Sequence, residues 1–281
     1  MSKPVTVKPF PVEEEYKKKN GITPEDISVL RQWLDTQPHL PGELLGDLDL
    51  ILTYHCCDRS FEVTKQVLDL HFTLRTLFAI TKNRVVDEKL IRCLHIYLTI
   101  PLEIRSHTGS AIFYARLIDY DIKKFVFQDG VSVRNCENEK YLPAPPNDVY
   151  VCSIFFVQEA MLVKLKALHF MNAPSFMDRL LMIIKPFMKK SLIDMLVIHQ
   201  IGSKTIEKYL SMDGLPKECG GKFKSLNEAR DDLIERFKLN ANYFIEENKR
   251  RVVESKRPGK PKTISDIFGS VEGTFKKLEI D

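Results

Sequence analysis

The sequence predicts an α/β protein in which a helical N-terminal module precedes a domain of mixed strands and helices. Apolar residues at helical spacing dominate residues 11–84, which predicts a compact bundle of helices. Residues 111–118 are bounded by turn residues and are typical of a strand. Residues 163–198 indicate a strand, a helix and a second strand. Because such crossovers are right-handed and join parallel strands, we expect a mainly parallel or mixed sheet with helices over one face.

The helical module covers residues 1–84 and contains three predicted helices. The first begins after Thr23, which caps it, with Pro24 at the first helical position and Asp26 at the third. The second covers about residues 45–56. Ser60 caps the third, in which residues 61–77 carry a broad apolar stripe. The short connections between these helices predict that they pack together.

The second domain covers residues 85–245, and its most informative part lies between residues 163 and 221. We predict a strand at 163–171, an apolar helix at 175–184, a turn at 185–187 and a strand at 195–198. Seven of the eight methionines lie between Met161 and Met212, and this flexible side chain suits a surface that adapts to a shape. Residues 226–245 predict one long amphipathic helix. The polar residues 126–148, which end in LPAPP, predict a loop.

The third part is a basic tail at residues 246–281. It carries seven basic residues between Lys249 and Lys262, together with two prolines, which predicts an extended or partly disordered chain. Its last hydrophobic segments, ISDIFG at 264–269 and FKKL at 275–278, are candidates for docking back on the domain.

Composition places the chain among soluble globular proteins, with 28% charged and 44% hydrophobic residues. No run approaches the length of a membrane-spanning segment, and residues 1–19 lack the apolar region of a signal peptide. Six cysteines without CxxC spacing predict reduced thiols in a cytoplasmic protein. A net charge of +4 predicts no nucleic-acid partner.

The common enzyme motifs are missing from the sequence. It contains no HExxH, no GxSxG and no GxGxxG after a strand. The seven histidines are scattered, and His169 and His199, each at a predicted strand, are typical of hydrogen-bonded core histidines. We therefore predict no enzymatic activity, no catalytic residue, no metal and no cofactor.

Several segments resemble the CRAL-TRIO lipid-binding family at its signature spacings. They are FMNAP at 170–174, the amphipathic helix that follows, KPF at 185–187 and LPKECGG at 215–221. Upstream, the helices around 30–34 and 60–75 and the segment ARLIDYD at 115–121 resemble the family's helical N-terminal module and first strand. The likeness covers roughly residues 25–245 and is nearest to the tocopherol- and retinaldehyde-binding transfer proteins.

The resemblance implies a closed apolar pocket between a sheet floor and a mobile helical gate at residues 175–188. It implies a hydrophobic small molecule or a lipid as the ligand. The residues that we expect to line this pocket are Leu168, Phe170, Phe176, Leu180, Ile183, Ile184 and Phe187. The alternation of side chains along a strand leaves a reversed assignment open, in which Leu165, Ala167, His169 and Met171 face the ligand.

The resemblance also implies peripheral contact with an anionic membrane. In the transfer-protein relatives, basic side chains at the positions of Lys164 and Lys166 contact phosphoinositide headgroups near the gate. The candidates in this chain are Lys164, Lys166, Lys189, Lys190 and Arg59. Lys185 either joins them or caps the end of the gate helix. We therefore expect a cytoplasmic protein that is transiently at membrane surfaces, although a solvated surface also explains these lysines.

The chain departs from the family pattern in the middle of the lipid-binding domain. The family normally has a helix and a central strand with an Asp-x-x-Gly pattern before the strand of Leu168, but residues 126–160 are too few for both and lack that pattern. Two accounts remain open. The chain is a shortened isoform or a mispredicted gene product, or residues 149–156 stand in as the strand. A missing strand would leave unpaired backbone groups and a breach in the pocket wall.

Two functions are compatible with the sequence. The first is an intracellular carrier that takes up a hydrophobic small molecule or lipid and transfers it between membranes. The alternative is a CRAL-TRIO module without a pocket that acts as a phosphoinositide-dependent membrane or protein adaptor through the lysines and the basic tail. An occupied apolar cavity would favour the carrier, whereas a collapsed cavity with intact vesicle binding would favour the adaptor.

Overall fold

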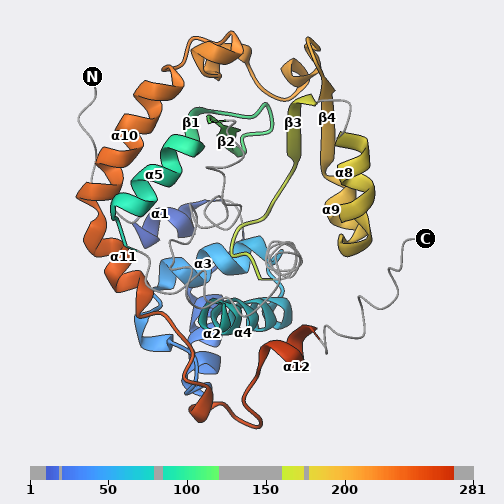
Figure 1. The fold of residues 1–281 in the computed structure, drawn as a ribbon. Helices are drawn as coiled ribbons and strands as arrows, with labels where there is room; N and C mark the ends of the chain where they lie inside the picture. Colours follow the sequence, from blue (N-terminus) through green and yellow to red (C-terminus); the bar gives the residue numbers. More distant parts are fainter. Residues whose placement is uncertain (1–10, 19–20, 79–84, 120–159, 174–176, 269–281) are drawn as a thin grey trace. The chain divides into compact units, whose positions relative to one another are not determined.

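The computed structural model describes residues 11–18, 21–78, 85–119, 160–173 and 177–268, which form two compact units (Figure 1). Among these residues, the helical unit comprises 11–18, 21–78, 160–164 and 246–268. The sheet unit comprises 85–119, 165–173 and 177–245. The described residues up to 78 and those from 246 onward therefore share one unit, and the described strands lie in the other.

The helical unit begins with helices whose starts are set by local caps. Its elements are α1 (Val12–Lys17), α2 (Pro24–Asp35), η1 (Gly42–Leu44), α3 (Asp47–Cys56), α4 (Phe61–Leu77), η8 (Glu254–Lys256) and α12 (Ile264–Phe268). The Thr23 hydroxyl accepts a hydrogen bond from the Asp26 N–H at 3.2 Å, and the Asp26 carboxylate accepts one from the Thr23 N–H at 2.9 Å. The Ser60 hydroxyl accepts one from the Val63 N–H at 3.3 Å. The predicted starts of α2 and α4 are therefore confirmed, because these side chains satisfy free amide groups of the first turn.

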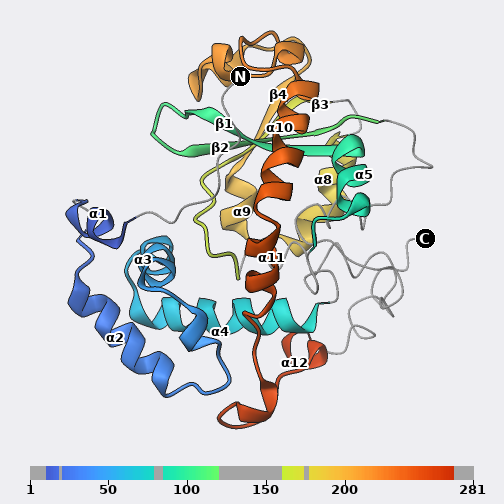
Figure 2. The same ribbon diagram turned by 90° about the vertical axis from the view of Figure 1, so that its left-hand side faces the viewer.

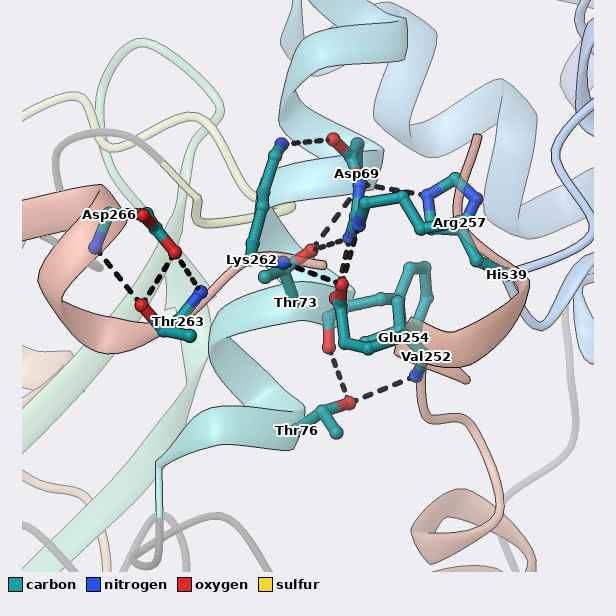
Figure 3. Close-up of polar contacts among 11 residues, drawn as sticks. His39, Asp69, Thr73, Thr76, Val252, Glu254, Arg257, Lys262, Thr263 and Asp266 are labelled. Atoms are coloured by element: carbon teal, nitrogen blue, oxygen red, sulfur yellow. Dashed lines mark hydrogen bonds and ion pairs between the residues drawn. The ribbon is translucent and has the colours of Figure 1, made fainter. Parts of the chain in front are cut away.

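The described part of the tail, residues 246–268, belongs to the helical unit. Asp69 on α4 accepts hydrogen bonds from Arg257 Nη1 at 2.6 Å and Lys262 Nζ at 2.5 Å, and it contacts His39 Nε2 at 3.1 Å (Figure 3). The Glu254 carboxylate accepts a further bond from Arg257 Nε at 2.7 Å. Asp69 and Arg257 are 188 residues apart, so the sequence pattern of the tail alone does not reveal these pairs.

The sheet unit alternates strands with helices and short 3₁₀ turns. Its elements are α5 (Glu88–Ile96), β1 (Tyr97–Arg105), β2 (Ala111–Leu117), β3 (Leu168–Ala173), α8 (Met177–Ile184), η4 (Lys185–Phe187), α9 (Lys190–Asp194), β4 (Leu196–Gln200), η5 (Thr205–Lys208), η6 (Met212–Gly214), η7 (Lys217–Cys219) and α10 (Leu226–Leu239). Helix α11 (Ala241–Asn248) follows and passes into the helical unit after residue 245. The predicted strands near 111–118 and 195–198 and the helix near 175–184 are confirmed.

The strands form two separate pairs among the described residues, which differs from the single sheet that we predicted. β1 and β2 are antiparallel, whereas β3 and β4 are parallel and are joined through α8 and α9. The predicted strand at 163–171 begins only at Leu168, because β4 begins at Leu196, the partner of Leu168. Residues 163–167 therefore have no strand partner among the described residues.

The core of the sheet unit lies where α5 and α10 pack side by side against β1 (Figures 1 and 2). Leu98, Ile100 and Leu102 on β1 are buried at every second position, as expected for a strand with one face in a core. Leu94 on α5 and Leu233 on α10 join the same core. The sequence analysis missed β1 and α5, because a short helix runs directly into the strand without turn residues between them.

The predicted helix at 226–245 is divided into α10 and α11. Asn240 separates them, and its backbone leaves the helical region at φ −108° and ψ 22°. Its side-chain amide donates a hydrogen bond to the Arg236 carbonyl at 2.7 Å. Asparagine favours such ends because its side chain competes for backbone partners.

Candidate functional site

The two faces of the β3–β4 pair have different surroundings. Met171 on β3 packs against the core of the sheet unit. Because neighbouring side chains on a strand point to opposite faces, Leu168 and Phe170 face away from that core. Their partners in the parallel register are Leu196 and Ile198, so all four residues share one apolar, half-buried face. Leu168 and Phe170, two of the predicted pocket residues, therefore lie on the same face of this strand pair.

Two histidines occupy the core side of the same strands. His169 Nδ1 lies 3.0 Å from His199 Nε2, and His199 Nδ1 lies 2.7 Å from the Thr205 hydroxyl. Burial lowers the pKa of His199, and burial together with the neighbouring His199 lowers the pKa of His169. The prediction of hydrogen-bonded core histidines is confirmed. Within the described ranges, no group of three or more His, Cys, Asp or Glu is placed to hold a metal.

The segment LPKECGG at 215–221 forms a turn that leads from β4 to α10. Leu215 is buried, and Gly220 adopts a left-handed backbone with φ +80°. The Glu218 carboxylate accepts hydrogen bonds from the Leu226 N–H at 2.9 and 3.0 Å, which ties the turn to the start of α10. A Cβ at Gly221 would collide with the Leu215 carbonyl group. The backbone geometry of this turn accounts for both glycines.

One stretch of the chain thus contains the parallel strands β3 and β4, the helices that join them, and the glycine turn at 215–221. Residues 146–221 match the CRAL/TRIO domain. CRAL/TRIO domains bind hydrophobic ligands such as lipids. The match supports the predicted family and includes β3, α8, α9, β4 and the turn. None of the curated proteins compared with this chain matches it.

Helix α8 of the CRAL/TRIO segment exposes one largely apolar face. Met182 and Ile183 are 65% and 69% exposed, and Arg179 on the same face is also exposed. These positions follow the i, i+3 and i+4 spacing of a helix face. Ile183, a predicted pocket residue, therefore lies on the outer face, whereas Leu181 is buried.

The rotation of α8 was difficult to predict because residues 180–184 are all apolar. Arg179 was the available signal, since a charged residue four positions before Ile183 indicates that this side of the helix is exposed to solvent. Of the other predicted gate residues, Phe176 lies outside the described residues. The side chains of Leu180, Ile184 and Phe187 are also not among those described.

The predicted headgroup residues are divided between the two units. Lys166, Lys189 and Lys190 belong to the sheet unit and are exposed, with the two neighbouring lysines at the start of α9. Lys164 and Arg59 belong to the helical unit.

Lys164 forms an ion pair with Asp58 in the helical unit. Arg59 is exposed and has a left-handed backbone, with φ 61°. In the part of the chain that the structure describes, no helix has the length and apolar character needed to cross a bilayer.

Proposed function

We propose that this protein is an intracellular carrier that binds a hydrophobic small molecule or lipid and transfers it between membranes. Two observations support the proposal. Residues 146–221 match the CRAL/TRIO domain, and Leu168 and Phe170 belong to an apolar face of the β3–β4 pair that points away from the core. Burying a few hundred Å² of ligand surface at about 25 cal/mol per Å² contributes on the order of 10 kcal/mol. Such binding requires no catalytic group, so the proposal is one of transport and not of catalysis.

The exposed face of α8 suggests where the carrier meets a membrane. Met182 and Ile183 offer apolar surface, and Arg179, Lys185 and Pro186 are exposed beside them. Apolar side chains flanked by cations are typical of helices that lie at the surface of an anionic bilayer. We propose that this face, with Lys166, Lys189 and Lys190, contacts phosphoinositide headgroups while the ligand enters or leaves.

The adaptor alternative relies partly on a free basic tail, and the contacts of the tail weaken it. Arg257 and Lys262 are paired with Asp69, and Arg250 lies 3.2 Å from the carboxylate of Asp49. Lys249 is paired with Glu246. These four cations are therefore paired within the helical unit. The carrier is therefore the function that we favour, and a ligand of the tocopherol or retinoid type is our proposal for its class.

The carrier proposal predicts that the purified protein holds a hydrophobic ligand in a 1:1 complex. Native mass spectrometry, with organic extraction of what co-purifies, measures this directly. Phe170→Asp should remove the ligand, because a charged group on an apolar binding face must be desolvated. Phe113→Asp is the matched control, since Phe113 is 69% exposed on β2 and lies outside the proposed site.

Equal ligand retention by the wild type and the Phe170→Asp variant would contradict the assignment of the site. A folded wild-type protein that is empty, and that also refuses a panel of isoprenoids and phospholipids, would contradict the carrier itself. In that case, retained binding to phosphoinositide vesicles would support the adaptor.

The membrane proposal predicts that Lys189→Ala/Lys190→Ala weakens binding to phosphoinositide-containing vesicles by about 30-fold at low salt. Each cation near an anionic leaflet contributes about 1 kcal/mol, and about 2 kcal/mol corresponds to this factor. Vesicle co-sedimentation measures the change. Lys217→Ala/Lys222→Ala removes the same charge from exposed positions in the turn near 215–221 and should have a much smaller effect. Equal losses in the two variants would show a response to net charge alone.

A further inference from the structure

The His169–His199 pair links β3 to β4 on the face opposite Leu168 and Phe170. The two rings are stacked, with centroids 5.3 Å apart and planes at 23°. The Tyr209 ring lies 4.5 Å from the ring of His169, and Thr205 contacts the far nitrogen of His199. His199 is 2% exposed, so water cannot readily replace its partners.

The number of protons on the pair determines whether its hydrogen bond exists. The contact between His169 Nδ1 and His199 Nε2 needs one proton, which either ring can supply. One additional proton on an outer nitrogen preserves this bond but places a charge on the half-buried His169 or on the buried His199. A second additional proton leaves two N–H groups that point at each other between two imidazolium rings. Acid therefore first charges the pair and then breaks it.

Among the residues that the structure describes, no carboxylate contacts the pair to favour a charged histidine. β3 and β4 contain no Asp, Glu, Lys or Arg. The charged residues of η5 and its flanks, Lys204, Glu207 and Lys208, are exposed, and so is Asp194 before β4. Tyr209 presents its ring, and His107 in the β1–β2 turn contacts only the backbone carbonyl of Lys208 through its side chain.

We propose that the His169–His199 pair is an acid-sensitive latch that holds β3 to β4 when neutral and loosens the two strands when it takes up protons. The same strands carry the apolar face that is proposed to bind the ligand. If the protein is a carrier, as proposed above, the latch therefore makes ligand release dependent on pH. The latch itself is a property of the strand pair and can be measured without any ligand.

The direction of the effect follows from the preference of the folded chain for neutral rings. Burial lowers the pKa of both histidines, whereas an exposed histidine in the unfolded chain titrates at about 6.5. Above that pH both states are neutral and the latch is intact. As the pH falls below it, the unfolded or opened state binds more protons. Opening of the two strands therefore becomes more favourable as the pH falls below this value.

Hydrogen exchange of the full chain, followed by mass spectrometry, tests the latch. We expect protection of peptides that cover 168–173 and 196–200 to fall at least about tenfold between about pH 7.5 and pH 5, after correction for intrinsic exchange. Peptides from α10 should keep their protection. His169→Phe keeps an aromatic ring beside Tyr209 and leaves His199 as the only titrating member of the pair, so the fall should be smaller in this variant. His95→Gln, at an exposed position on α5, is the control and should behave as the wild type.

Unchanged protection of the two strand peptides in the wild type across this pH range would overturn the latch. An equal fall in the wild type and His169→Phe would also overturn it. If His169→Phe fails to fold, the wild-type protein still tests the latch, because the protection of its strand peptides can be compared with that of its α10 peptides across the same pH range. A chain that loosens in acid but binds no hydrophobic ligand at any pH would keep the latch and refute the carrier.

Discussion

Asp69→Ala should lower the free energy of unfolding of the helical unit by about 3–5 kcal/mol, the usual cost of breaking a buried ion pair. Asp69 holds Arg257, Lys262 and His39 together (Figure 3), and the Arg257 side chain is only 5% exposed. Without the carboxylate, a buried guanidinium loses one of its two anionic partners. Urea unfolding followed by the fluorescence of Trp33 measures the effect, because this single tryptophan packs against the core of the helical unit.

Glu62→Ala provides the control for this experiment on the same helix. Glu62 is exposed and pairs with Lys65 at 2.8 Å, so its removal should change the free energy of unfolding by no more than about 0.5 kcal/mol. A similar small change for Asp69→Ala would show that the tail is not held by this carboxylate. Release of the tail can be followed separately, because residues 250–262 should become more sensitive to protease in the Asp69 variant.

The same carboxylate predicts how the helical unit responds to acid. Burial alone would raise the pKa of Asp69, but the hydrogen bonds from Lys262, Arg257 and His39 outweigh it and lower this pKa from 3.8 to about 2. The ionised form therefore stabilises the fold above pH 4, and this contribution is lost as the pH falls from about 4 to about 2. The difference of nearly two pKa units corresponds to about 2 kcal/mol. In Asp69→Asn, this part of the acid dependence should be missing.

Gly221→Ala should destabilise the sheet unit by about 3 kcal/mol, at the upper end of what overpacking usually costs. The new Cβ would collide with the carbonyl of Leu215 and would lie 2.6 Å from the carbonyl oxygen of Met212. Both obstacles are backbone atoms, and the turn is further held by a hydrogen bond from the Phe223 N–H to the Leu215 carbonyl at 3.1 Å. The collision therefore cannot be relieved by rotating a side chain. Urea unfolding followed by far-UV circular dichroism measures the loss.

Gly220→Ala distinguishes steric collision from backbone strain at the neighbouring position. Gly220 has a left-handed backbone, but a Cβ there meets no atom within 4 Å. Only the conformational cost of about 1–2 kcal/mol is expected. If Gly220→Ala proved more damaging than Gly221→Ala, the close approach at Gly221 would not be the decisive feature of the turn. Trp33 fluorescence should report little change in either variant, since both glycines lie in the sheet unit.

Local chemistry made several elements predictable. Thr23 and Ser60 lie where their hydroxyls can accept amide hydrogens three residues ahead, and α2 and α4 begin there. The strand, helix and strand around β3 and β4 also follow from local patterns, and the order of motifs pointed to the CRAL/TRIO segment before any geometry was known. Such features depend on residues that are close together in the chain.

The candidate site was less predictable, because it depends on the orientation of elements. Residues 180–184 are apolar on every side, so their sequence does not determine which side of α8 is buried. The structure places Leu181 inside and Ile183 outside. The face of β3 was similarly ambiguous until the packing of Met171 against the core showed that Leu168 and Phe170 face the other way.

The sequence by itself determined the α/β class, the starts of the capped helices and the CRAL/TRIO segment, since these follow from caps, side-chain periodicity and motif order over short stretches. Only the tertiary structure decided that the tail joins the helical unit, that the described strands form two pairs, and that His169 meets His199. Each of these depends on contacts between residues distant in the chain. Asp69 and Arg257 show the reason most clearly, because these residues are 188 positions apart and only folding brings their side chains into contact.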